Sequence, residues 1–483
     1  MIATAATVAP GSGHLLIHRR RTGALILSAF LLGILVIVVL AASLPRRELL
    51  ENLLSTRVLI VAILVCLAAA LAWIAVIIRT YVLAKPPGLG SGRRVIGAAT
   101  VAALCMVVAA PLGFSANLAN SQRNLLDTLF PSGGDGSAAL GKPRLNILLL
   151  GSDAGPDRTG TRTDTMMVAS IDTRTGRTTL FGLPRNIGYA QFPRDSAMAR
   201  EFPKGFHDSN DPNSGDYLLN AVYAYGHAFP ELAPSGPTRD PGLNLLHSSI
   251  SHMLGLPIDY YIEISMAGFA AIIDALGGLR VDVGPARIPI GGITPSGRQV
   301  RPEGYLERGI QRLSGEEALD FARSRTGSTD YVRMGRQRCL IQYVLDQKSP
   351  TDLLTNFQGV AKATTNSVFT NIPRDVLPAL VSLAGSTSGT AALESVAFDP
   401  NLSDPEASGG RFNTARPNFP YMREIVRDAI ARNQVVAPLV TPAPTTSAAP
   451  TTKSRSGGSS ATRTTPGKPP PAAAAPTPLA RSC

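Results

Sequence analysis

Three long apolar runs stand near the start of the chain, at Gly23–Leu44, Val58–Ile78 and Val95–Phe114. None of them contains a charged residue. A helix needs about 20 apolar residues to cross the hydrocarbon core of a bilayer, so each run predicts a transmembrane helix. A cleaved signal peptide is the alternative for the first run, but it is longer than the apolar part of a typical signal and two more runs follow it.

Shorter apolar segments follow in the middle of the chain. Leu145–Leu150 predicts a strand buried on both faces, and Thr165–Ile171 and Thr178–Leu183 predict two more strands. The residues between the last two, Asp-Thr-Arg-Thr-Gly-Arg, are typical of a turn and indicate a hairpin. A hairpin places the start of one strand beside the end of the next, so we expect Asp164 to lie next to Arg185.

Asp153 follows the first of these strands. If that strand pairs antiparallel with the second, Asp153 reaches the same edge of the sheet as Asp164. Downstream, apolar periodicity predicts helices and strands in alternation, which indicates an α/β layered domain with helices on both faces of a sheet. The expected helices are 216–228, 243–254 and 267–276, and the expected strands are 259–264 and 279–283.

A capping box is present at Ser314, with Glu317 as the third residue of the helix that it opens. If the chain becomes extended after Phe321, Arg323 and Arg325 project to one face, because side chains two residues apart in an extended chain point the same way.

Asp330 is the expected N-cap of the next helix, Tyr331–Gln347. Arg333, Arg336 and Gln337 then share a polar stripe about 100° wide near the N-terminus of that helix. A helix N-terminus with convergent arginines suits an anion.

Phosphate is the anion that this set of residues favours, because planar guanidiniums bind its oxygens in pairs and stay charged. Asp153 and Asp164 in one site would repel each other unless a cation lay between them, and Mg²⁺ prefers such oxygen ligands. Each residue taken alone also fits an ordinary role, as an ion-paired surface arginine or a capping aspartate.

The net charge of the whole chain says less about its partners than it first suggests. The chain has 46 basic and 34 acidic residues, a net charge of +12, which is typical of proteins that bind nucleic acid. However, residues 1–114 hold 10 basic and 2 acidic residues, residues 434–483 hold 5 and none, and residues 115–433 hold 31 and 32. The middle of the chain is therefore nearly neutral, and we expect no nucleic-acid partner.

The basic residues near the apolar runs predict the membrane topology. Seven flank one side, Arg19, Arg20, Arg21, Arg79, Lys85, Arg93 and Arg94, and three flank the other, Arg46, Arg47 and Arg57. By the positive-inside rule, residues 1–22 are cytoplasmic and everything from residue 115 is outside the cell. We expect a linker over 115–139, a folded domain over 140–433 and a disordered tail over 434–483, rich in Pro, Thr, Ala and Ser. Its last residue, Cys483, is expected to be an incidental thiol.

The ordered motifs of the domain resemble the LytR-CpsA-Psr family of cell-wall glycopolymer transferases. The likeness spans Leu145–Gln347 and rests on the segments NILLLGSDAG, RTDTMMVASID, LFGLPRN, LLNAVYAYG, IDYYIEISMAGFAAIIDALGGLRVDV and LSGEEALDFARSRTGSTDYVRMGRQR. It implies an extracytoplasmic three-layer α/β/α domain with a central mixed sheet. In the family, this domain moves a polymer from a polyprenyl pyrophosphate carrier to a peptidoglycan hydroxyl as a phosphodiester, with Mg²⁺.

The resemblance also assigns residues. Asp153 and Asp164 match the acidic positions associated with the metal, and Arg185, Arg323 and Arg325 match the arginines that bind the pyrophosphate. The remaining matches, in a D-x-x-R-x-x-x-Q pattern, are Asp330, Arg333 and Gln337. The chain departs from the family at Asn186, where an aspartate is frequent, and in a long insertion over 187–215.

The expected partners are the lipid-linked glycopolymer, peptidoglycan and the bilayer. Phe269, Ile272, Ile273 and Leu276 fall on one predicted helix, and they either line a channel for the isoprenoid or pack in the core. Two other functions remain open from the sequence: a wall-binding module that holds the polymer without transferring it, and a membrane-bound transcriptional regulator. The regulator would need a DNA-binding face inside the cell, where only about 22 residues precede the first span.

Overall fold

The computed structural model describes residues 8–44, 55–85, 90–131, 141–152, 163–211, 214–291, 300–348, 359–360, 367–386, 393–434 and 477–478. Three long helices form the N-terminal part, α3 (Arg20–Ser43), α5 (Thr56–Ala84) and α6 (Ser91–Leu129), after the short helix α2 (Ser12–Leu16). All three are long and apolar enough to cross a membrane. The third continues 15 residues beyond the predicted end at Phe114, so the first part of the expected linker is helical.

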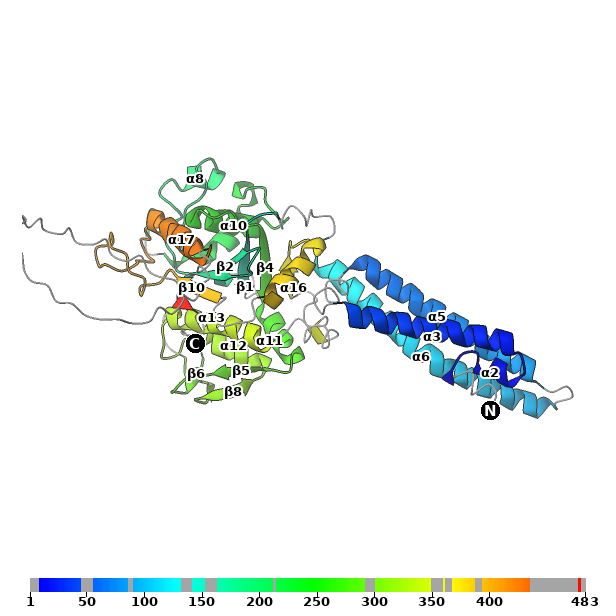
Figure 1. Ribbon diagram of the computed structural model, residues 1–483. Helices are drawn as coiled ribbons and strands as arrows, with labels where there is room; N and C mark the ends of the chain where they lie inside the picture. The colour runs from blue at the N-terminus through cyan, green and yellow to red at the C-terminus, as the bar shows by residue number, and fades with distance from the viewer. Residues whose placement is uncertain are drawn as a thin grey trace, which may run out of the picture.

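A mixed seven-stranded sheet forms the centre of the following domain (Figure 1), with the strand order β11-β10-β3-β2-β1-β4-β9. The predicted hairpin is present, and β1 also pairs antiparallel with β2. By contrast, β4 runs parallel to β1, and β10 runs parallel to β3. The strands are β1 (Arg144–Ser152), β2 (Thr163–Asp172), β3 (Thr178–Leu183), β4 (Tyr260–Ser265), β9 (Val368–Thr370), β10 (Leu393–Ala397) and β11 (Thr477–Pro478).

Helices cover both faces of the sheet, which gives the expected three layers (Figure 1). One layer contains α9 (Val222–Ala228), α10 (Pro241–Leu254) and α17 (Phe419–Gln434), and the other contains α11 (Met266–Ala275), α12 (Gly315–Arg323) and α13 (Asp330–Gln347). Successive side chains of a strand point to opposite faces. Leu148 and Leu150 therefore join the core beneath α10, whereas Leu149 faces α11 and α13.

Several predicted elements take a different place or length. The strand expected at 279–283, β5 (Leu279–Asp282), lies outside the central sheet and pairs with β8 (Ile310–Leu313). A second small sheet joins β6 (Ile288–Ile290) and β7 (Gly304–Leu306). The helix expected over 216–228 begins as two 3₁₀ turns, Gly215–Tyr217 and Leu219–Ala221, before α9. Of the predicted tail, Gln434 ends α17, Thr477–Pro478 form β11, and the rest lies outside the described residues.

The insertion over 187–215 belongs to the core on the α10 side. It contains the short helix α8 (Ala197–Glu201), and Ile187, Phe192, Met198 and Phe206 are all buried with residues of α10. Burial of apolar side chains contributes to the stability of the folded domain. The insertion is thus part of the domain's packing.

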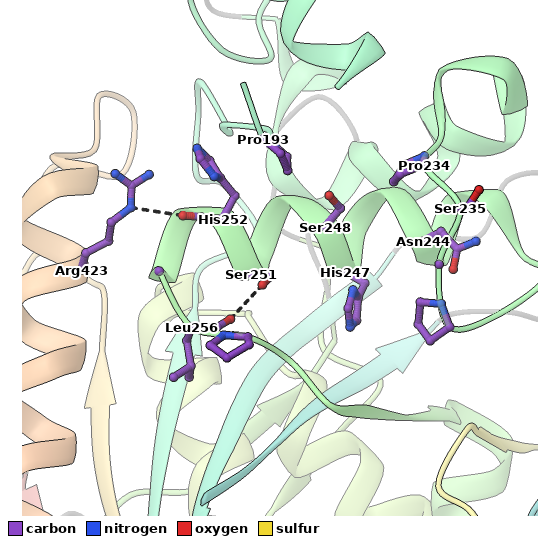
Figure 2. Close-up of a pocket in the computed structure, with 14 residues that line it drawn as sticks. Pro193, Pro234, Ser235, Asn244, His247, Ser248, Ser251, His252, Leu256 and Arg423 are labelled. Carbon is purple, nitrogen blue, oxygen red and sulfur yellow. Dashed lines mark hydrogen bonds between the residues drawn. The ribbon is translucent and has the colours of Figure 1, made fainter. Parts of the chain in front are cut away.

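The outer face of α10 carries a groove of about 530 Å³ (Figure 2). Its lining includes His247, His252 and Arg423, and Arg423 Nε donates a hydrogen bond of 3.1 Å to the carbonyl oxygen of His252. Burial lowers the pKa of both histidines, so they are neutral near pH 7. Among the residues that the structure describes, no site residue predicted from the sequence lines this groove.

Candidate active site

Asp164 and Arg185 meet at one edge of the sheet, as the hairpin predicts. Asp164 is the second residue of β2, and Arg185 follows the end of β3. The Nη1 atom of Arg185 lies 2.7 Å from Oδ1 of Asp164 and donates a hydrogen bond to it. A charge-assisted hydrogen bond of this length is strong, so it fixes the position of the guanidinium.

The N-terminus of α13 enters the same place, but its cap differs from the prediction. Thr329 is the N-cap, and its Oγ1 accepts a hydrogen bond of 3.3 Å from the backbone nitrogen of Val332. Asp330 is therefore the first residue of the helix. The prediction of Asp330 as the cap was wrong, because a threonine one position earlier satisfies the same free backbone donor.

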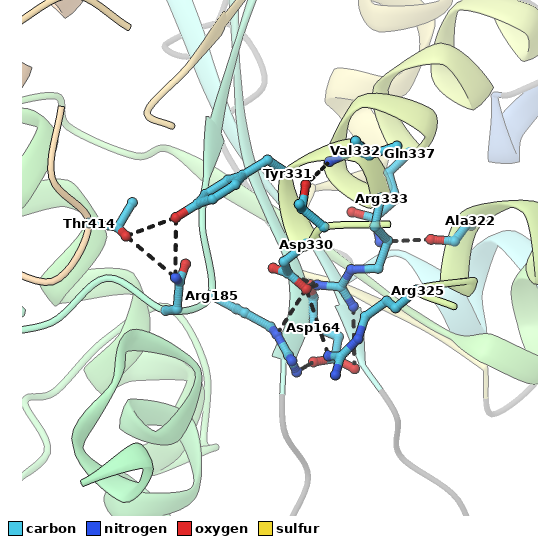
Figure 3. A network of polar contacts seen from close by, with 12 residues as sticks. Asp164, Arg185, Ala322, Arg325, Asp330, Tyr331, Val332, Arg333, Gln337 and Thr414 are labelled. Carbon is cyan, nitrogen blue, oxygen red and sulfur yellow. Dashed lines mark hydrogen bonds and ion pairs between the residues drawn. The ribbon is translucent and has the colours of Figure 1, made fainter. Parts of the chain in front are cut away.

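The Asp330 carboxylate is thereby free to contact arginines from three segments (Figure 3). Its Oδ1 lies 3.4 Å from Arg185 Nε, 3.7 Å from Arg325 Nη1 and 3.2 Å from Arg333 Nη2. This oxygen is buried and has no hydrogen-bond partner among the described residues. Among the described residues, the negative charge of this oxygen is therefore balanced by the positive charges of the three guanidiniums, without a hydrogen bond.

Arg333 joins the two carboxylates. Its side chain is only 3% exposed, and its Nη2 donates a hydrogen bond of 3.0 Å to the backbone carbonyl of Asp164. Its Nη1 also lies 3.7 Å from Asp164 Oδ2. Burial lowers the pKa of Arg333, and the nearby Asp330 and Asp164 oppose that shift. Arg333 therefore ties α13 to the start of β2.

Asp164 stays ionised in this setting. Burial alone would raise its pKa, but Arg185, Arg333 and Arg325 outweigh that effect and hold the pKa below its ordinary value. Its side chain remains 38% exposed. An ionised and accessible carboxylate is able to bind a cation or accept a proton.

Arg323 has a different environment from Arg325. The helix α12 begins with the predicted capping box at Ser314 and ends at Arg323, two residues later than expected, and Ser324 leaves it in an extended conformation. Arg325 contacts Asp330, whereas Arg323 lines a cavity beside Arg333. Among the described residues, Arg323 forms no ion pair with Asp164 or Asp330. Its guanidinium is thus available for a ligand.

The polar stripe predicted on α13 is present. Gln337 Nε2 donates a hydrogen bond of 3.3 Å to the carbonyl of Ala322, and Arg336 Nη2 donates one to the carbonyl of Ser324. Burial, and then the charge of Arg333, lower the pKa of Arg336 to about 10. Both side chains hold the end of α12 against α13, so the stripe fixes Arg323 next to Arg333.

An apolar cavity of about 340 Å³ opens from this charged cluster between the sheet and the layer of α11, α12 and α13. Its charged lining residues are Asp164, Arg323 and Arg333. The four apolar residues that the sequence singles out, three on α11 and one at its C-cap, are all in the lining: Phe269, Ile272, Ile273 and Leu276. Ile273 is also 2% exposed within a core cluster, so core packing and cavity lining, alternatives in the sequence, occur together.

Comparison with known proteins places this arrangement in a family. Residues 128–405 match the LytR_cpsA_psr family, and they include every predicted site residue. The chain belongs to the LytR_cpsA_psr family.

Relatives of this LytR_cpsA_psr protein carry two kinds of name. A protein of Enterococcus faecalis named polyisoprenyl-teichoic acid–peptidoglycan teichoic acid transferase TagU is 28% identical over 240 residues, which are 48% of this chain and 63% of the relative. Biofilm regulatory protein A of Streptococcus mutans is 28% identical over 235 residues, 47% of this chain and 50% of the relative. The chain thus matches less than two thirds of the length of these relatives.

Solved structures are also similar to the LytR_cpsA_psr chain. The crystal structure of TagV from B. subtilis has 22% sequence identity and a TM-score of 0.41, and the alignment covers 60% of this chain and 97% of that one.

Of the two metal ligands predicted from the sequence, Asp153 and Asp164, the structure describes only Asp164. Asp153 lies outside the described residues. No group of three or more His, Cys, Asp or Glu side chains suited to a metal occurs in the described ranges. Asp164, and Oδ1 of Asp330, which has no hydrogen-bond partner among the described residues, nevertheless provide oxygen donors at the site. Donors of this type suit Mg²⁺, which usually takes one or two carboxylates and completes its shell with water and phosphate oxygens.

The sequence did not predict one group of polar contacts beside the site. Tyr331 contributes its hydroxyl, 3.0 Å from Oγ1 of Thr414, and Asn186 Nδ2 lies 3.4 Å from both oxygens. Thr414 comes from a loop more than 80 residues later in the chain, and no motif marks it. The amide of Asn186 thus links the end of β3 to this loop.

Proposed function

We propose that the protein is a membrane-anchored phosphotransferase that moves a glycopolymer from a polyprenyl pyrophosphate carrier to a peptidoglycan hydroxyl. The observation that carries the proposal is the junction of the apolar cavity with the arginine cluster. A pocket that is mostly apolar, with a few charged groups at one place, suits a ligand with a long apolar tail and an anionic head. A polyprenyl pyrophosphate has this form.

The charges support the same ligand. Arg185, Arg323, Arg325 and Arg333 bring four positive charges to the site, and Asp164 and Asp330 bring two negative ones. Among these described residues the positive charges outnumber the negative ones, which favours an anionic ligand. Guanidiniums bind phosphate oxygens in pairs. We infer that the arginines exchange part of their contacts with the carboxylates for the pyrophosphate.

In the proposed reaction, the isoprenoid occupies the cavity lined by Phe269 and Ile273. The arginines and Gln337 hold the pyrophosphate head group, and Gln337 also holds the end of α12. The acceptor hydroxyl attacks the sugar-proximal phosphorus, and the bond from that phosphorus to the bridging oxygen breaks. Polyprenyl phosphate leaves, and the polymer remains on the acceptor as a phosphodiester. The hydroxyl proton passes to Asp164 or Asp330. The arginines stabilise the charge on the transferred group, which is the main catalytic contribution in phosphoryl transfer.

Mg²⁺ belongs to the proposal as a cofactor. When bound, it would offset negative charge on the phosphates, and Asp153 and Asp164 would hold it. Two carboxylates in one site would repel each other without a cation between them, which supports a metal there if Asp153 joins Asp164 as the sequence predicts.

The basic residues that flank the apolar helices support a cell-membrane location, with the N-terminus in the cytoplasm and the domain outside. Peptidoglycan and lipid-linked polymer are then both on the side of the active site.

The test is a transfer assay. Purified full-length protein in detergent is incubated with a lipid-linked oligosaccharide, a peptidoglycan fragment and Mg²⁺, and the release of polyprenyl phosphate is followed by mass spectrometry. We expect release that depends on the acceptor and stops on addition of a chelator. Binding of the lipid-linked oligosaccharide without release of polyprenyl phosphate would contradict the proposal and favour a binding module.

A further inference from the structure

The membrane helix α6 does not end where its apolar run ends. It continues from Ser115 to Leu129 as one helix, which at 1.5 Å per residue is about 22 Å of additional length. This extension carries charged side chains, Arg123 and Asp127, which are costly inside a bilayer and favour a place outside it. The end of α6 is therefore in a position to contact the folded domain.

An ion pair holds the end of this helix. Arg374, in the 3₁₀ turn Arg374–Val376, is 6% exposed, and its Nη1 donates a hydrogen bond to Oδ1 of Asp127. The two residues are 247 positions apart in the chain. The other carboxylate oxygen of Asp127 lies 3.4 Å from Nε of Arg123, one turn earlier on α6. A buried guanidinium without a partner is costly, so this pair favours the docked position of the helix.

Two further contacts join the same parts of the chain. The backbone nitrogen of Arg374 donates a hydrogen bond of 3.2 Å to the carbonyl oxygen of Pro131. Phe130, the C-cap of α6, packs against a buried apolar cluster of the domain. The cluster contains Leu145, Ile147, Ile372 and Val376, and two residues of α16 (Leu377–Ser386), Leu377 and Leu380, border it. Figure 1 shows the end of α6 beside α16. Polar and apolar contacts thus dock the anchor helix on the domain.

The cluster that receives Phe130 adjoins the wall of the apolar cavity. Leu149 of β1 and Ile262 of β4 pack against this cluster, and both also line the cavity. Ile262 pairs with Thr370 of β9, four residues before Arg374. The same strands therefore carry the contacts to the anchor helix and one wall of the cavity.

We propose that Asp127, Phe130 and Arg374 form an anchor clamp that holds the cavity in one orientation to the membrane, so that the isoprenoid of a bilayer-bound donor enters it directly. This inference rests on the proposed function, because a donor needs this orientation only if its apolar chain starts in the bilayer. A flexible connection would let the domain turn above the membrane, and orienting it for each donor would cost entropy. None of the three clamp residues is among the described residues that line the cavity, so they act as positioning residues.

Transfer from two donors tests the anchor clamp. Full-length protein in lipid vesicles receives a lipid-linked oligosaccharide with either a long polyprenyl chain, which stays in the bilayer, or a short prenyl chain, which dissolves in water. Asp127→Asn and Phe130→Ala break different contacts of the clamp. We expect each to slow release of the prenyl phosphate from the long-chain donor by about tenfold and to leave release from the short-chain donor unchanged. Asp375→Asn, at an exposed position beside Arg374, should leave both rates unchanged.

Hydrogen exchange read by mass spectrometry follows the docking itself. The amide of Arg374, which donates to Pro131, should exchange faster in Asp127→Asn than in the wild type, and Asp375→Asn should match the wild type. An equal loss of transfer from both donors, an unchanged rate with the long-chain donor, or unchanged exchange at Arg374 would each overturn the anchor clamp.

Failure of the proposed function gives a different result. The wild type would then release no prenyl phosphate from either donor, whereas a failed clamp leaves wild-type release from both donors intact. Exchange at Arg374 would in that case still decide whether α6 is docked on the domain.

Discussion

Arg333 donates a hydrogen bond of 3.0 Å to the backbone carbonyl of Asp164, although the two residues are 169 positions apart in the chain. The bond joins the first turn of α13 to the start of β2, and the same guanidinium lies 3.2 Å from Asp330. Arg333 is therefore both a possible phosphate contact and the link that holds the two carboxylates in place.

Replacement of Arg333 by methionine should destabilise the domain, because it leaves Asp164 and Asp330 with fewer positive neighbours. Loss of one partner from a fully buried pair costs about 3–5 kcal/mol. We expect about 2–3 kcal/mol here, since the Asp164 side chain is 38% exposed and water compensates it in part. Thermal proteolysis of the full-length protein in detergent measures the loss. Arg280→Met, at an exposed position on β5, is the control, and an equal loss in both would refute the role.

Thr329 and Asp330 should have separable effects. Thr329→Ala removes the cap of α13 and should cost about 1 kcal/mol of stability, with transfer activity largely kept. Asp330→Asn retains the cap and removes a charge that contacts three arginines, so it should reduce transfer while the helix stays formed. Thermal proteolysis and the transfer assay on both variants check this. The opposite pattern would show that Asp330 is the cap after all.

The apolar cavity should bind the isoprenoid. Leu345 lines the cavity and is 55% exposed, whereas Val332, on the same helix, is 51% exposed and does not line it. Leu345→Asp should weaken binding of a polyprenyl pyrophosphate by at least tenfold, because a buried carboxylate next to an apolar chain is costly. Val332→Asp should bind as the wild type does. Fluorescence titration with a labelled lipid measures both, and equal affinities would count against this use of the cavity.

Glu263 should make stability depend on pH. It is 6% exposed on β4, and burial raises its pKa. The folded state therefore holds its proton at pH values where the unfolded state has lost it. Stability should fall as the pH rises from the ordinary carboxyl pKa to the raised one, by up to about 1.4 kcal/mol per pH unit. Glu263→Gln should remove this slope in melting curves between pH 4 and 8, and the exposed Glu231→Gln should keep it. An unchanged slope in Glu263→Gln would refute the assignment.

Local patterns predicted much of the site because the residues involved lie at the ends of short elements. The turn over 172–177 and the lengths of its two strands were enough to bring Asp164 beside Arg185. The capping box at Ser314 gave the start of α12 correctly. Helical spacing likewise grouped Arg333, Arg336 and Gln337.

Other features depend on contacts that no local pattern contains. Thr329 and Asp330 are both good N-caps, and only the hydrogen bond from the backbone nitrogen of Val332 to Oγ1 of Thr329 shows which of them is the cap. The pairing of β5 with β8 rather than with the central sheet depends on where the chain returns after β7. Thr414 reaches Tyr331 and Asn186 from a loop that no motif in the sequence marks.

The direct test of the central claim is the rate of polyprenyl phosphate release by Arg323→Lys in the transfer assay. Arg323 lines the cavity without an ion pair to either site carboxylate in the described chain, and lysine keeps the charge but loses the planar pair of donors. Loss of such an arginine typically costs about 10³–10⁵ in rate. We predict at least a 10³-fold (~4 kcal/mol) slower release, with Arg308→Lys, at an exposed position, unchanged. Wild-type release by Arg323→Lys would contradict the account.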